Sequence, residues 1–75
     1  MSYTYEELIE DLEMGMEIEF GYKGDRYAIS WSDRGWHLAK YGEVEPQTFK
    51  GYEELLQNGK IDSKNIREIW PYIRP

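Results

Sequence analysis

The sequence contains no cysteine and a single histidine, His37, among its 75 residues. The lack of cysteine excludes disulfide bridges and thiolate metal sites, and one histidine alone does not make a metal site. Long apolar runs are also missing, and the first residues lack the basic and apolar regions of a signal peptide. These absences favour a cytoplasmic protein that binds no metal ion and no cofactor.

Catalytic motifs are missing as well. The chain has no Gly-x-Ser-x-Gly turn to present a nucleophilic serine, and His37 is expected on the polar face of a strand as an ordinary residue. The seven glycines are scattered singly and form no phosphate-binding loop. Acidic pairs such as Glu6 and Glu10 are expected on an exposed helix, whereas catalytic carboxylates need a perturbing environment. We therefore predict that the protein is not an enzyme.

Basic residues are absent from residues 1–22. The net charge of the chain is −6, and the acidic residues of this opening segment account for it, because the remainder holds eight acidic and nine basic residues. The acidic residues in question are Glu6, Glu7, Glu10, Asp11, Glu13, Glu17 and Glu19. Recognition of nucleic acid or of anionic lipid requires clustered Lys and Arg, so we expect neither as a direct ligand.

Alternation of apolar and polar residues between Met16 and Tyr41 predicts three antiparallel strands at about 16–22, 26–32 and 35–41. A two-residue turn at Lys23-Gly24 would place Phe20 opposite Tyr27, and a turn at Gly24-Asp25 would shift the pairing by two residues with the same faces. Both remain open. The next turn places Trp36 opposite Trp31, and we expect most of these aromatic residues to pack in the core and across strands.

Helices are predicted on both sides of this sheet. The first covers about 5–14, with Thr4 and Glu7 as a capping box and Gly15 beyond its end. Two more are predicted at about 52–58 and 63–70, the last with Asp62 as its N-cap. Pro46 indicates a loop, with Thr48-Phe49 as a candidate short edge strand. The expected fold class is α+β: a single small α-β-β-β-α-α domain, a three-stranded antiparallel meander with helices packed on one face.

Two segments carry a resemblance. The first is Glu17-Ile18-Glu19-Phe20-Gly21-Tyr22-Lys23-Gly24 after an acidic helix, and the second runs from Phe49 through Tyr52-Glu53-Glu54-Leu55-Leu56 and Lys60-Ile61-Asp62 to Ile66-Arg67-Glu68-Ile69-Trp70. Together they resemble a loose group of small acidic proteins of Gram-positive bacteria, their phages and prophages. The resemblance implies a genomic setting in which many small acidic proteins inhibit host factors or defence systems, and it assigns no functional residue.

These observations lead to one main functional hypothesis. The acidic segment would dock on a basic surface of a protein partner and would inhibit or modulate it. The candidate interaction residues are Glu6, Glu7, Glu10, Asp11, Glu17 and Glu19. Two alternatives are a solvated face that only keeps the protein soluble, and a structural or oligomerising domain, such as a homodimer. Twelve aromatic residues exceed what so small a core readily encloses, so Tyr41, Tyr52 or Tyr72 are candidates for exposure.

Overall fold

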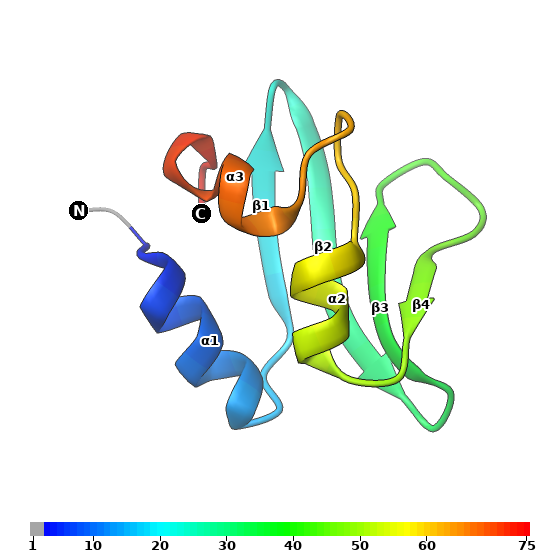
Figure 1. The fold of residues 1–75 in the computed structure, drawn as a ribbon. Coiled ribbons are helices and arrows are strands. Elements are labelled where there is room, and N and C mark those ends of the chain that lie inside the picture. The colour runs from blue at the N-terminus through cyan, green and yellow to red at the C-terminus, as the bar shows by residue number, and fades with distance from the viewer. Residues whose placement is uncertain (1–2) are drawn as a thin grey trace.

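Four antiparallel strands form one sheet, and the helices lie over one of its faces (Figure 1). The computed structural model describes residues 3–75. The strands pair in the order β1-β2-β3-β4, so each pairs with its neighbours in the chain. The elements are α1 (Tyr5–Glu13), β1 (Ile18–Tyr22), β2 (Asp25–Ser32), β3 (Gly35–Lys40), β4 (Gln47–Phe49), α2 (Tyr52–Asn58), α3 (Ile66–Ile69) and the 3-10 helix η1 (Trp70–Tyr72).

The first hairpin turns at Lys23-Gly24, which decides between the two registers. Phe20 pairs with Tyr27 and Ile18 with Ile29. Lys23 and Gly24 both have positive φ, at 51° and 84°. Two positive φ values in succession are typical of a type I′ turn, whose twist matches that of the strands.

The second hairpin has the predicted register, with Trp31 opposite Trp36 and Ile29 opposite Leu38. The sheet has a fourth strand beyond the expected three-stranded meander, because Gln47–Phe49, which contains the candidate edge strand Thr48-Phe49, pairs with β3. Phe49 lies opposite Trp36 in this pairing. The strand is only three residues long, and Pro46 directly precedes it, which is consistent with the exclusion of proline from a central ladder.

The predicted cap of the last helix was wrong. Asn65, not Asp62, is the N-cap of α3, and its side chain accepts a hydrogen bond from the Glu68 amide at 2.9 Å. Asp62 lies before the helix in a tight turn with a φ of 56°, and its carboxylate pairs with Lys23 at 2.7 Å. Pro71 lies in η1, where the regular helix has given way to a 3-10 turn.

The core lies between the sheet and the helices. Leu8 and Leu12 of α1 are almost fully buried, as are Phe20 and Ile29 of the sheet. Trp70 contacts Phe20 edge to face, with ring centroids 5.2 Å apart. The same face of the sheet continues past Ile29 to Trp31, but there the helices stop, and Trp31 is 51 % exposed. Trp31 packs across strands on Trp36, as expected, with ring centroids 6.4 Å apart, but it lies outside the buried core.

The outer edge of β1 is covered at Gly21 by the C-terminal segment. The Gly21 amide donates to the Arg74 carbonyl at 2.6 Å, and the Arg74 amide donates back to the Gly21 carbonyl at 2.7 Å. These two bonds form an isolated antiparallel bridge. A strand edge with unpaired amides and carbonyls invites pairing with other chains, so this bridge protects the longer of the two sheet edges.

Candidate functional site

The outward side of α1 carries exposed acidic side chains. Leu8 and Leu12 point into the core, which leaves the opposite side of the helix to solvent. The exposed acidic residues on α1 are Glu6, Glu7, Glu10 and Glu13. The helix begins with a complete capping box, in which the Glu7 amide donates to the Thr4 hydroxyl and the Thr4 amide donates to the Glu7 carboxylate. We call these four residues the acidic face of α1.

Asp11 has a different role from these four residues. Its side chain is half-buried and accepts a hydrogen bond from the Tyr3 hydroxyl. Burial raises the pKa of the Tyr3 hydroxyl, and the hydrogen bond to Asp11 raises it further. The main-chain carbonyl of Asp11 also accepts from the Met16 amide at 3.0 Å. Asp11 therefore holds the chain on either side of α1 against the helix.

Glu17 and Glu19 do not join the acidic face of α1 directly. Glu17 is exposed in the segment before β1. Glu19 lies on the open face of the sheet, opposite the face that the helices cover, and its carboxylate is 3.7 Å from the guanidinium of Arg26. The structure thus brings Glu6, Glu7 and Glu10 together and places Glu19 on the other side. Glu13 completes the helical face, a position that the spacing from Glu6 and Glu10 already indicates.

An apolar surface lies at the end of α1, and the sequence pattern did not reveal its exposure. We call it the Met–Trp patch and define it by Met14, Met16 and Trp31, which are 69, 47 and 51 % exposed. The turn after α1 and the β2–β3 hairpin lie at the same end of the sheet (Figure 1). The Trp31 indole nitrogen donates to the Gly15 carbonyl at 2.7 Å, so the tryptophan is fixed against this turn.

Two further aromatic residues adjoin the Met–Trp patch. The rings of Trp31 and Trp36 are 6.4 Å apart, and those of Trp36 and Tyr52 are 5.8 Å apart. Partial burial raises the pKa of the Tyr52 hydroxyl, and the negative charges of Glu13 and Glu53 raise it further. The two carboxylates therefore place negative potential around the Tyr52 hydroxyl.

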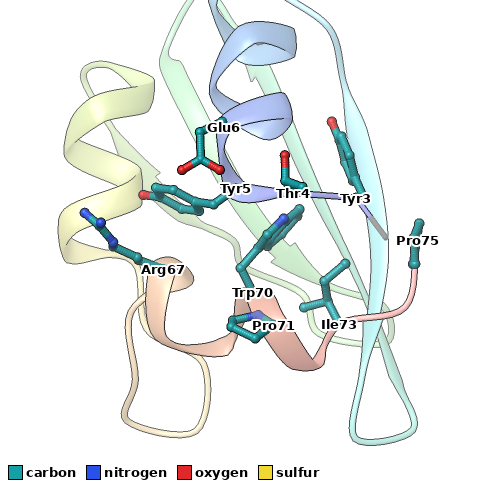
Figure 2. A pocket seen from close by; sticks show the side chains of 9 residues that line it. All are labelled: Tyr3, Thr4, Tyr5, Glu6, Arg67, Trp70, Pro71, Ile73 and Pro75. Atoms are coloured by element: carbon teal, nitrogen blue, oxygen red, sulfur yellow. The ribbon is translucent and has the colours of Figure 1, made fainter. Parts of the chain in front are cut away.

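A groove of 580 Å³ lies at the other end of α1, between its first turn and the C-terminal segment (Figure 2). Tyr3 and Tyr5 form its walls with Pro71 and Ile73, and the Trp70 indole lies at its centre. Trp70 is 3 % exposed, and its Nε1 hydrogen has no acceptor in residues 3–75. The Arg67 guanidinium lies over the Tyr5 ring, 5.6 Å from its centroid. The groove is aromatic and shallow, and its buried donor is out of reach from solvent.

His37 takes part in a hydrogen-bond chain on the open face of the sheet. Its Nε2 is 2.7 Å from the Ser32 hydroxyl and its Nδ1 is 3.0 Å from the Thr48 hydroxyl. The chain links β2, β3 and β4 through their side chains. A serine–histidine pair functions as a nucleophile when a carboxylate orients the imidazole, and here a threonine hydroxyl occupies that place. His37 thus connects its own strand to both neighbouring strands by side-chain hydrogen bonds.

The part of the chain from residue 3 to residue 75 contains no cluster of three His, Asp or Glu side chains placed to hold a metal ion. Across the same residues, every helix is too short or too polar to cross a membrane. No known protein family matches the chain, and comparisons with curated proteins and with solved structures give no match.

Proposed function

We propose that this protein is a small, non-enzymatic interaction module that binds a basic surface of another protein through the acidic face of α1. One observation carries the proposal: Glu6, Glu7, Glu10 and Glu13 are all exposed on one helix, in a segment of 22 residues that has no Lys or Arg. Charges of one sign on one surface raise the rate of association with an oppositely charged partner and exclude partners of like charge.

The anchoring of α1 supports this proposal, because a rigid surface loses little conformational freedom when it binds. The helix is capped at Thr4 and held by the buried side chains of Leu8 and Leu12. The backbone turn after it is closed by hydrogen bonds from Gly15 to Leu12 at 3.0 Å and from Met16 to Asp11 at 3.0 Å. The carboxylates therefore stand at fixed positions on the surface.

The resemblance to small phage and prophage proteins extends the proposal to a biological role. In that setting the module acts in the cytoplasm and inhibits or modulates a host or defence protein. The partner would present Lys and Arg side chains, as nucleic-acid-binding grooves do. The second candidate function is a structural or oligomerising domain with no inhibitory activity, and the exposed apolar side chains of Met14 and Trp31 favour it.

Capture of host proteins by the tagged chain and by two charge-matched variants tests the main proposal. Glu6→Lys/Glu10→Lys reverses two charges on the acidic face of α1, and Glu43→Lys/Glu45→Lys reverses two exposed charges in the loop between β3 and β4. Both variants have the same net charge. We expect only the first to lose the captured partner, and we expect capture by the wild type to weaken with salt. Equal capture by all three proteins would contradict the proposal.

Asp11 is left unchanged in this experiment because it accepts a hydrogen bond from Tyr3, and its loss would disturb the fold. Sedimentation of the wild type over a range of concentrations tests the second candidate. A monomer mass at every concentration would exclude the second candidate function, an oligomerising domain, whereas a concentration-dependent mass would support it.

A further inference from the structure

The Met–Trp patch exposes side chains that small domains usually bury. Met14 and Met16 flank Gly15, and the Trp31 indole lies across that glycine, with its nitrogen 3.7 Å from the place where a Cβ would stand. Scattered apolar residues on a surface are ordinary, but Met14 and Met16 stand on either side of the glycine that the Trp31 indole covers. Exposed apolar residues gathered in this way are found at interaction sites. Tryptophan is also enriched among the residues that carry most of the energy of an interface.

The patch is held ready for contact before any partner arrives. The hydrogen bond from Trp31 to Gly15 fixes the indole, and the packing of Trp31 on Trp36 supports it from the sheet. The two methionines have flexible, polarisable side chains that adapt to the shape of an apolar group. A rigid tryptophan between two adaptable methionines therefore forms a surface that can enclose one or two apolar side chains.

The charges around the patch are arranged unequally. Along α1 and the start of β1 they are negative, with Glu10 and Glu13 on the helix and Glu17 before the strand. Across the hairpin, Asp33 is accompanied by Arg34 and Lys50, so that side is mixed. The surface that runs from the patch along α1 is therefore the acidic side. Glu6, Glu10 and Met14 follow one another at intervals of one helical turn, about 5–6 Å between neighbouring side chains.

We propose that the Met–Trp patch anchors an apolar side chain of an amphipathic helix in a partner protein, while the acidic face of α1 receives Lys or Arg residues of the same helix. This inference rests on the proposed function and names the chemistry of the partner. Basic residues one turn apart on the partner match the spacing of Glu6 and Glu10. An exposed helix such as α1 offers no unpaired main-chain groups to an extended segment, which favours a helical partner.

A second copy of the chain fits the patch less well. A symmetric dimer through Trp31 would bring Glu13 and Glu17, which directly neighbour Met14 and Met16 in the chain, from both copies to one interface, where like charges oppose association. A partner with clustered Lys or Arg removes this repulsion and gains attraction. The charge distribution therefore selects a basic partner over self-association.

A displayed library of random 16-residue peptides, selected against the full-length protein, tests the inference. We expect the selected peptides to carry Lys or Arg at intervals of three or four residues next to one or two large apolar residues. Synthetic copies should become helical on binding, by circular dichroism. Acidic peptides, basic residues at every second position, or no enrichment over an empty surface would each overturn the inference.

Variants of the protein then locate the binding surface. Trp31→Ala and Met14→Ser/Met16→Ser should each weaken binding of the selected peptides at least about tenfold, as expected for the central residue of an interface. Tyr72→Ser is the matched control, because Tyr72 is 73 % exposed and lies in η1, away from the patch. The methionine variant keeps the hydrogen bond between Trp31 and Gly15, so its effect does not depend on the folding of the tryptophan variant.

The two proposals fail in different ways in this experiment. If binding requires Glu6 and Glu10 but tolerates both patch variants, the acidic face remains the interaction surface and the inference about the Met–Trp patch is wrong. If binding tolerates Glu6→Lys/Glu10→Lys as well, the proposed function is also wrong. A wild-type dimer in sedimentation that Trp31→Ala dissociates would identify a second copy as the occupant and overturn the inference.

Discussion

The Trp31 indole nitrogen donates a hydrogen bond to the main-chain carbonyl of Gly15 at 2.7 Å, and this bond joins the end of β2 to the turn after α1. The two residues are 16 positions apart. Gly15 has a φ of 77°, a conformation that glycine adopts without steric cost, and the absence of a side chain lets the indole lie against it. One bond thus secures both the exit of the first helix and the most exposed tryptophan.

Removal of this bond should cost a measurable part of the stability. We expect Trp31→Phe, which keeps an aromatic ring on Trp36 but has no donor, to lower the free energy of unfolding by about 0.5–1.5 kcal/mol. Urea denaturation followed by circular dichroism measures the difference. Trp36→Phe, in which no donor to Gly15 is lost, provides the comparison. A loss below the error of the measurement would show that solvent replaces the bond fully.

Gly35 should be the least replaceable glycine of the chain. It has a φ of 128°, and a Cβ at this position would overlap the main-chain carbonyl oxygen of Phe49. Gly35→Ala must therefore strain the backbone and push β4 away from β3, and we expect a loss of about 2 kcal/mol or more. Gly24→Ala is the control, because Gly24 also has positive φ but has open space around it. Its loss should be near 1 kcal/mol, and a larger loss than for Gly35→Ala would contradict the prediction.

The strands were predictable because their side chains alternate strictly. One face of the meander bears Ile18, Phe20, Tyr27 and Ile29, and any shift by one residue would bury glutamates. The turn itself was not predictable, since Lys23-Gly24 and Gly24-Asp25 preserve the same faces. The structure selects the first by giving Lys23 a positive φ, which sequence propensity alone does not favour for lysine.

Other features depend on contacts that are distant in sequence. Asp62 has the side chain of an N-cap, but its backbone forms a turn in which Ile61 and Lys64 exchange main-chain hydrogen bonds at 2.9 and 3.0 Å. Asn65 is therefore the N-cap of α3. The exposure of Trp31 depends likewise on where the helices end over the sheet, which no local pattern specifies. The exposure of Glu6, Glu7 and Glu10 on α1 was predictable, whereas the half-burial of Asp11 and the exposure of the Met–Trp patch were not.

The Tyr3 hydroxyl makes the stability sensitive to alkaline pH. Its pKa is raised above the ordinary value of 10.0 by burial, by the hydrogen bond to Asp11 and by the charge of that carboxylate. A raised pKa in the folded state contributes stability that is complete below pH 10 and is lost as the pH rises toward the folded pKa. We expect the free energy of unfolding to fall above pH 10, and to fall less steeply in Tyr3→Phe.

Urea denaturation at several pH values checks this difference. At pH 8, Tyr3→Phe should be less stable than the wild type by about 1–2 kcal/mol, because it lacks the hydrogen bond to a carboxylate. The difference in the free energy of unfolding between the wild type and Tyr3→Phe should become smaller as the pH rises. Asp11→Asn keeps the Tyr3 hydroxyl but removes the negative charge beside it. The free energy of unfolding of this variant should therefore fall with pH less steeply than that of the wild type and more steeply than that of Tyr3→Phe. A constant gap between wild type and Tyr3→Phe at every pH would contradict the prediction.

Trp70 combines a large buried ring with a donor that has no acceptor in residues 3–75. Trp70→Phe keeps a ring against Phe20 and Tyr3 while it removes the unpaired donor, whose burial costs about 1–3 kcal/mol. Removal of the unpaired donor offsets much of the lost packing, so we expect Trp70→Phe to lower the free energy of unfolding by less than about 1.5 kcal/mol. Trp70→Ala should cost about 3–5 kcal/mol. If thermal unfolding shows that Trp70→Phe and Trp70→Ala lose equal stability, the indole N–H has a hydrogen-bond partner in solution and the prediction is wrong.

The bridge between Gly21 and Arg74 should keep the protein from associating through β1. Arg74→Pro removes the amide that donates to the Gly21 carbonyl at 2.7 Å and leaves the β1 edge with an unpaired acceptor. Exposed strand edges pair with other chains, so this variant should sediment as larger species at concentrations where the wild type does not. Arg74→Ala changes the charge but retains the amide, and should behave as the wild type. If Arg74→Ala also associates, the side chain and its charge protect the edge, and the main-chain bridge does not.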